Sequence, residues 1–390
     1  MSALKKSLDL KDLTLFGLSS ILGSGGFNLI GKAVRAGSAA WPALFGTVAT
    51  LLLGGAWSYT RAHQIAGTNT SETDVIHSVF GSLGENAAAI GIMLSSIVSI
   101  AVILVFVTEL IFPSAHWGFQ VFFSTVLLAA MAGFSLVGID INKTAVNGFT
   151  WLLVVVLAAA MGLGGWGALK GLSPVDDMSL PTPRAATTSL MYFFFIMAGF
   201  DALMKFAQEA KAPESDMPTA FFGTNIIADV LVLGVSAALA MWVPGLTEKQ
   251  EMNALGHLFA RFMGPSAVGI MRLLMIIFML VTTFVVFLAT SRYLFSFGEK
   301  REGLKWLTEL NASQVPWAAV AIVFVIGFIG LVINHIDVLV RVANGGFIVT
   351  LGLVAAAVSA IDFGDGPLWS AAVNALTAAG FGGLLTITVL

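Results

Sequence analysis

The sequence of 390 residues contains no cysteine and has few charged residues, which make up 11% of the chain. The lack of cysteine excludes disulfides, thiolate metal sites and a catalytic thiol. Soluble domains carry about a quarter charged residues, so this chain could not cover a folded surface with polar groups in water. A net charge of −3 gives no general basic field. We therefore expect neither a disulfide-linked partner nor nucleic acid.

Recognisable catalytic patterns are also absent from the sequence. It contains no Gly-Xaa-Ser-Xaa-Gly or His-Glu-Xaa-Xaa-His motif, and its five histidines lack the spacing of metal ligands. The segment Gly23–Gly26 superficially resembles a nucleotide-binding loop, but no Gly-Lys-Ser/Thr follows it. We assign no catalytic residue, and we expect neither an enzyme nor a cofactor other than a coupling Na⁺ or H⁺.

Apolar residues dominate instead, at 57% of the chain with a mean hydropathy of +0.93. In a lipid bilayer, such a chain needs spans of about 20 apolar residues that satisfy their own backbone groups, and helices do this. The sequence predicts an all-α polytopic membrane protein with about 11 transmembrane helices. They lie near 12–34, 40–62, 87–112, 117–138, 145–169, 187–210, 218–243, 262–297, 316–334, 336–361 and 367–388.

Lysine and arginine near the span ends predict the orientation, because cytoplasmic loops carry an excess of these residues. The count of these residues favours a cytoplasmic N-terminus. We expect the protein to lie in a plasma or cytoplasmic membrane. Residues 1–11 are expected to be a cytoplasmic tail rather than a signal peptide, because polar residues interrupt any apolar core.

The first predicted span is interrupted by Gly23-Ser24-Gly25-Gly26. Each glycine costs a helix about 1 kcal/mol relative to alanine. Backbone N–H and C=O groups freed at this depth are tolerated only inside protein or beside a wet cavity. A half-helix starting at Phe27 would offer its positive end to a carboxylate. The alternative is a patch of small residues for helix packing.

The sixth span is interrupted at Ala198-Gly199-Phe200-Asp201. An acid at membrane depth is a functional candidate by default, so Asp201 is a predicted substrate-binding residue. Lys205 lies four residues on, the favourable spacing for an ion pair on a helix. That pair could be structural or could take part in coupling or gating. Phe200 could be core, or a lid over the substrate.

Several short motifs, in this order and spacing, resemble those of the amino acid–polyamine–organocation (APC) superfamily of amino acid permeases. Ile21–Phe27 resembles the family's first-span signature. The segments 199–202 and 208–213 are similar to its sixth-span pattern, and 289–292 to the end of its eighth span. The resemblance extends through about the first ten spans.

This resemblance implies a five-plus-five inverted-repeat transporter fold in which helices 1 and 6 are discontinuous. The first repeat would cover residues 12–169 and the second 187–361, with an additional C-terminal helix in 362–390.

The resemblance also implies how a substrate would bind. The backbone N–H groups of Ser24, Gly25 and Gly26 would hold an α-carboxylate. The amine would meet backbone carbonyls near Ile21 and Phe200, and Phe200 would be an aromatic gate.

Further polar residues are candidates for coupling or gating. Asp229 in the seventh span could take part in coupling, or could pair structurally with Lys205 or Arg272. The hydroxyls of Thr282 and Thr283 could bind sodium together with first-span carbonyls. Alternatively, each would bond the carbonyl four residues earlier. Thr150–Leu153 contains no lysine where many proton-coupled members of the family carry one.

The predicted function is that of a secondary transporter, a permease or exchanger, which moves amino acids across a membrane by alternating access. A polyamine or another organic cation is the alternative cargo. The alternative class is a channel or a non-transporting membrane subunit, although no selectivity-filter repeat is visible. The expected partners are a small-molecule amino acid or amine and the lipid bilayer.

Overall fold

The computed structural model describes residues 4–25, 29–67, 71–171, 179–242, 247–251, 253–333 and 336–389. Within these ranges the regular secondary structure is helical, apart from two isolated β-bridges. The first half consists of α1 Leu10–Gly25, α2 Leu29–Gly37, η1 Ser38–Ala40, α3 Trp41–Ala66, α4 Glu72–Ile111, α5 Trp117–Ser135 and α6 Ile139–Leu169.

The second half begins with another pair of short helices and ends beyond the repeat. It consists of α7 Pro183–Met197, η2 Phe200–Glu209, α8 Pro213–Trp242, α9 Glu248–Glu251, α10 Ala254–Met263, α11 Ser266–Glu299, η3 Glu302–Thr308, α12 Trp317–Ile333, α13 Ile336–Asp365 and α14 Leu368–Val389.

The number of membrane crossings agrees with the prediction of about 11. Nine stretches of the described chain are long and apolar enough to span a bilayer, counting 29–66 as one stretch. The apolar helix α12 is slightly shorter, and α1 completes the first, discontinuous crossing. The predicted eighth span, 262–297, begins later than expected. Gly264 adopts a φ of +84°, which separates α10 from α11 because the left-handed region interrupts a right-handed helix.

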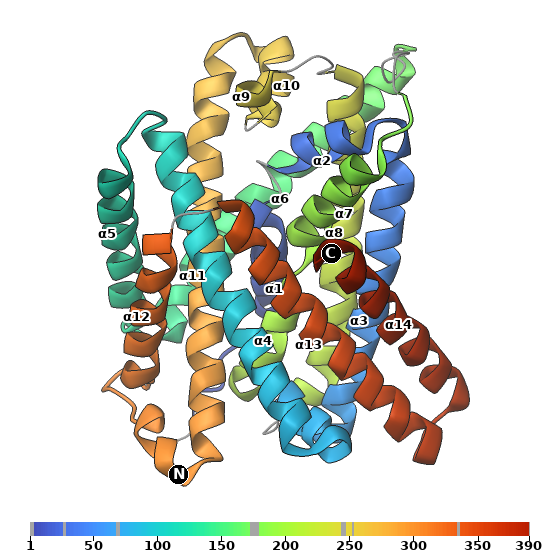
Figure 1. The fold of residues 1–390 in the computed structure, drawn as a ribbon. Helices are drawn as coiled ribbons and strands as arrows, with labels where there is room; N and C mark the ends of the chain where they lie inside the picture. Colours follow the sequence, from blue (N-terminus) through green and yellow to red (C-terminus); the bar gives the residue numbers. More distant parts are fainter. Residues whose placement is uncertain are drawn as a thin grey trace.

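The helix contacts show the five-plus-five arrangement of the fold. Equivalent helices of the two halves touch, as α3 and α8 do, α4 and α11, and α5 and α12. Contacts between non-equivalent helices of the two halves also correspond. The contact of α3 with α7 has its equivalent in that of α8 with α1, and the contact of α4 with α12 in that of α11 with α5. α13 lies along α4, and α14 packs outside it against α13 and α3 (Figure 1). The five-plus-five fold with discontinuous first and sixth helices is therefore confirmed.

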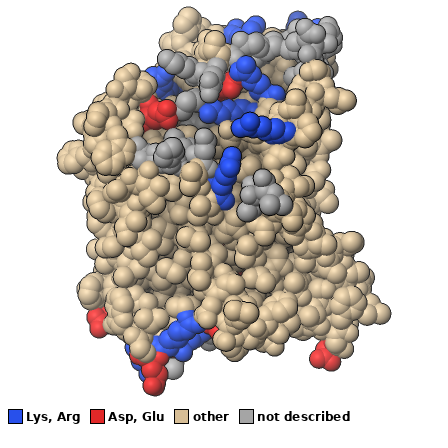
Figure 2. Space-filling view, in the orientation of Figure 1, with Lys and Arg blue, Asp and Glu red and all other residues tan. Residues whose placement is uncertain are grey.

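The exterior matches a membrane protein. Charged side chains gather toward the two ends of the molecule and leave a broad band between them with few charges (Figure 2). Large apolar side chains are exposed around the bundle, among them Leu83, Leu169 and Leu376. An exposed apolar surface of this extent is unfavourable in water, and contact with lipid removes it from water. The chain is therefore an integral, multi-pass membrane protein.

Candidate functional site

The break in the sixth crossing is a sharp change of backbone direction between α7 and η2. Ala198 is extended (φ −72°, ψ 148°), and Gly199 has φ +132°. A Cβ at Gly199 would lie 2.9 Å from the carbonyl oxygen of Ser20. Both the backbone angle and this close approach therefore require glycine. η2 then continues as a 3₁₀ helix, which is unusually long for that type.

The first crossing is likewise made of two helices. α1 ends at Gly25, with Ser24 and Gly25 as its last two residues, and α2 begins at Leu29. Gly26 lies outside the described residues. Ile21 is fully buried within α1. The assignment of Ser24, Gly25, Gly26 and the Ile21 carbonyl to substrate binding stays a prediction.

α1 is held tightly against both η2 and α11 near its end. The Ser20 hydroxyl donates to the carbonyl of Gly199 over 3.0 Å. On the other side, the Thr282 hydroxyl donates to the carbonyl of Ser19 over 2.6 Å. A Cβ at Gly23 would come within 1.6 Å of the Thr282 oxygen, so α1 approaches α11 as closely as glycine allows. The last two turns of α1 thus lie between the break in the sixth crossing and α11.

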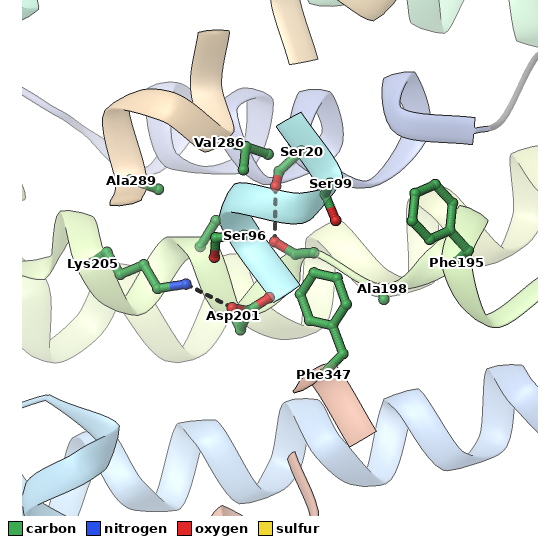
Figure 3. A pocket seen from close by; sticks show the side chains of 12 residues that line it. Ser20, Ser96, Ser99, Phe195, Ala198, Asp201, Lys205, Val286, Ala289 and Phe347 are labelled. Carbon is green, nitrogen blue, oxygen red and sulfur yellow. Dashed lines mark hydrogen bonds and ion pairs between the residues drawn. The ribbon is translucent and has the colours of Figure 1, made fainter. Parts of the chain in front are cut away.

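A cavity lies where the break between α7 and η2 meets α1, α4, α11 and α13 (Figure 3). Its lining combines polar residues, Ser20, Ser96, Ser99, Asp201 and Lys205, with apolar residues that include Phe195, Val286, Ala289 and Phe347. Its volume is about 20 Å³, enough for one water molecule and far too small for an amino acid. A substrate of that size would therefore require the surrounding helices to move apart.

Asp201 and Lys205 form an ion pair at the edge of this cavity. The Lys205 ammonium donates to Oδ2 of Asp201 over 2.8 Å, and both side chains are almost fully buried. The second carboxylate oxygen of Asp201, Oδ1, has no hydrogen-bond partner in the described part of the chain. The Ser99 hydroxyl also has no hydrogen-bond partner among the described residues. The cavity therefore offers a free acceptor and a hydroxyl, and such buried groups are costly to leave unsatisfied.

Phe200 is fully buried, but its ring lies away from the cavity lining. It packs edge-on against Tyr59, with ring centroids 5.5 Å apart. Its Cζ atom lies 3.1 Å from the position that a Cβ on Gly55 would take. The gate assigned to Phe200 stays a prediction, while Phe195 and Phe347 are the aromatic residues that line the cavity.

The remaining sequence candidates occupy three different settings. The Thr282 hydroxyl bonds a first-span carbonyl, whereas the Thr283 hydroxyl bonds the carbonyl of Met279 four residues earlier. Asp229 is half-buried in α8, and Lys205 pairs with Asp201 rather than with it. The sodium site and the coupling role of Asp229 stay predictions.

A buried ion pair lies at the end of η2, next to the N-terminal segment. Arg292 of α11 donates to both carboxylate oxygens of Glu209, each over 3.3 Å, and both side chains are buried. The N-terminal segment is fixed to the same place, because the backbone N–H groups of Ser7 and Leu8 donate to the Glu209 carbonyl. Lys211 N–H in turn donates to the Leu8 carbonyl. Parting these contacts would open the bundle on this side.

Sequence reasoning missed several residues of the site. Ser96 and Ser99 lie three apart in an apolar span, a spacing that places both on one helix face and could have identified them. Glu209 and Arg292 were visible only as parts of separate motifs, since 83 residues separate them. Phe347 carries no signal in an apolar span. These groups meet only through tertiary packing.

Comparisons with known proteins agree with this architecture. The chain is similar over its full length to the crystal structure of MhsT in complex with L-phenylalanine, with a TM-score of 0.64 and 14% sequence identity, covering 100% of both chains. At that identity the likeness shows the fold. No curated protein sequence matches the chain. A family model described as amino acid permease matches residues 8–389, and the chain therefore belongs to the amino acid permease family of the APC superfamily.

Proposed function

We propose that this amino acid transporter carries neutral amino acids with apolar side chains, by alternating access at the cavity between α1, η2, α4, α11 and α13. The observation that carries the proposal is the mixed lining of the cavity at the break of the sixth crossing, which combines serine hydroxyls and an ion pair with two phenylalanine rings. Asp201 offers an unpartnered carboxylate oxygen to an ammonium group. Phe195 and Phe347 offer aromatic surface to a side chain.

The charge of the site supports a zwitterion over a polyamine. Asp201 is already neutralised by Lys205, so the polar part of the cavity carries no net charge from this pair. An uncompensated second amine at this depth would cost several kcal/mol. A zwitterion brings its own balance of charge. The end of α1, where the predicted carboxylate site lies, is adjacent to the same cavity through Ser20.

The expected orientation has the N-terminus, the Glu209–Arg292 pair and the start of α4 on the cytoplasmic side. Support comes from the basic residues Lys300 and Arg301, which lie at this end and pair with acids of α4. Positive charge is enriched in cytoplasmic segments. The fold and the family both point to transport rather than to an enzyme.

Counterflow in proteoliposomes tests the proposal. Vesicles are loaded with unlabelled L-phenylalanine, and the uptake of labelled L-phenylalanine is followed while other compounds compete outside. We expect competition by leucine and methionine, and little by glutamate, lysine or putrescine at the same concentration. Preferential competition by putrescine would instead establish a cation transporter. Large currents far above carrier turnover would indicate a channel.

A further inference from the structure

An apolar groove lies on the outside of the bundle between α4, α13 and α14, apart from the substrate cavity. Its volume is about 470 Å³, which is within the range of pockets that hold small molecules, about 300–1,000 Å³. Ile90 and Leu94 of α4 form part of its wall and are 59% and 43% exposed. The groove therefore opens toward the lipid that surrounds the protein.

Two adjacent glycines of α13 line this groove for different reasons. A Cβ on Gly346 would lie 2.5 Å from the carbonyl oxygen of Gly91, so α4 and α13 pack as closely as glycine allows. A Cβ on Gly345 would meet no atom within 4 Å, and the φ of Gly345 is not in the left-handed region. Neither packing nor backbone conformation requires glycine at 345, although glycine destabilises the interior of a helix. The missing side chain instead leaves room in the groove.

The groove also contains a positive charge. Arg341 lines it and belongs to the apolar span Val338–Asp365. Its side chain is exposed and forms no hydrogen bond or ion pair with another described residue. An unpaired arginine in a membrane span is costly and is a functional candidate by default. Its planar fork of donors matches the oxygens of a phosphate group.

The charge and the apolar part of the groove follow each other along α13. Arg341, Gly345 and Val349 are spaced four residues apart and share one face of the helix. Arg341 lies three residues after the start of the span, where a long basic side chain reaches the membrane surface. From Arg341 to Val349 the helix rises about 12 Å toward the middle of the bilayer. This order of charge and apolar surface is that of a lipid headgroup and its acyl chain.

We propose that the groove is a binding site for an anionic phospholipid of the bilayer. The phosphate pairs with the guanidinium of Arg341, and one acyl chain lies over Gly345 and Val349 between α4 and α13. A zwitterionic phospholipid carries its own cation, which competes with Arg341 for the phosphate, whereas an anionic one does not. The site is independent of the substrate that the transporter carries.

The groove and the substrate cavity share two helices. On α4, Gly91 lines the groove, whereas Ser96 and Ser99 line the cavity. On α13, Gly345 lines the groove and Phe347 the cavity. With 3.6 residues per turn, the two sets lie on opposite faces of each helix. A bound chain would therefore contact the backs of the helices that border the substrate.

Native mass spectrometry of the purified, delipidated protein tests the proposal. It gives the apparent Kd of the first bound lipid, with phosphatidylglycerol and phosphatidylcholine of identical acyl chains as the two probes. We expect the wild type to bind phosphatidylglycerol at least tenfold more tightly. Arg341→Met should lower that affinity to the level of phosphatidylcholine. Gly345→Leu keeps the charge but fills the groove, and it should weaken the binding of phosphatidylglycerol at least tenfold as well.

Three control variants should keep the preference for phosphatidylglycerol. Arg261→Met removes an exposed arginine from α10, and Gly148→Leu changes another helical glycine whose Cβ would meet open space. Asp337→Asn removes the acid that precedes Arg341 by four residues in the sequence. An acid at that spacing competes with a phosphate for the arginine, so this variant should bind the lipid at least as tightly as the wild type.

The outcomes decide for or against the groove. Equal affinity of the wild type for the two lipids would overturn the proposal, as would unchanged binding of phosphatidylglycerol by Arg341→Met or by Gly345→Leu. If Gly345→Leu does not yield monodisperse protein, Ile90→Trp replaces it, because it fills the groove from an exposed position on α4. Lipid binding is measured without transport, so a wild type without counterflow would refute the proposed function alone.

Discussion

The buried pair of Glu209 and Arg292 should control the opening of the transporter on its N-terminal side. Replacing Arg292 with methionine leaves a carboxylate with 2% exposure of its side chain and no arginine beside it. Removing one partner of such a pair costs about 3–5 kcal/mol. Glu209 can avoid this cost by meeting water as the gate opens. The penalty should therefore favour opening rather than unfolding, and 3 kcal/mol corresponds to a shift of about a hundredfold in the open population.

The absence of cysteine in the chain supplies a clean assay. Ser99 lines the cavity, and its hydroxyl has no described partner, so Ser99→Cys introduces a thiol there without breaking a hydrogen bond. The rate at which a maleimide labels this thiol reports opening. We expect Arg292→Met to raise that rate by about a hundredfold, up to the rate of a freely exposed thiol, in protein that remains monodisperse.

A double variant provides the control. Glu209→Leu together with Arg292→Met removes both charges, and replacing a buried pair by apolar residues is often neutral or stabilising. This variant should label within a few-fold of the parent. The reasoning is refuted if Arg292→Met alone labels at the parental rate, because the pair would then not hold the gate closed.

Two further changes test the site directly. Gly23→Ala places a Cβ 1.6 Å from the Thr282 oxygen and must push α1 away from α11, at a cost of about 1–3 kcal/mol. The initial rate of uptake should therefore fall at least tenfold. Gly148→Ala is the control, because its Cβ meets open space, and it should leave the uptake rate unchanged. Asp201→Asn removes the acceptor of the substrate ammonium, a charged hydrogen bond of about 1.5–3 kcal/mol, so KM in the uptake assay should rise by at least tenfold; an unchanged KM would remove Asp201 from the binding site.

The fold was predictable because its determinants are local in the chain. Apolar runs of bilayer length define the crossings, Gly25 ends α1, and Gly199 lies at the break in the sixth crossing. The predicted bounds of the helices differ from the observed ones where the backbone angle of a single glycine decides where a helix starts or bends. Gly264 separates α10 from α11, and Gly81, at φ +62°, kinks the start of α4. Whether an isolated glycine adopts a positive φ depends on packing that the sequence does not display.

The site was only partly predictable, because its partners come from distant segments. The Asp201–Lys205 pair was expected from a spacing of four residues in a predicted α-helix, and the pair forms although η2 is a 3₁₀ helix. Glu209 and Arg292, in contrast, pair across 83 residues, and nothing near either residue indicates the other.

The form of η2 connects the substrate site with the gate. Asp201, Lys205 and Glu209 are spaced four residues apart along it, from the cavity to the Arg292 pair. At about 2 Å rise per residue in a 3₁₀ helix, eight residues cover about 16 Å, whereas an α-helix would cover about 12 Å. Long 3₁₀ segments are strained and often mark hinges. A partial change of η2 toward α-helical geometry would displace Glu209 by up to about 4 Å relative to the cavity. That distance exceeds the 3.3 Å length of the bonds to Arg292, so such a change at Asp201 would break the Glu209–Arg292 pair through one ten-residue helix.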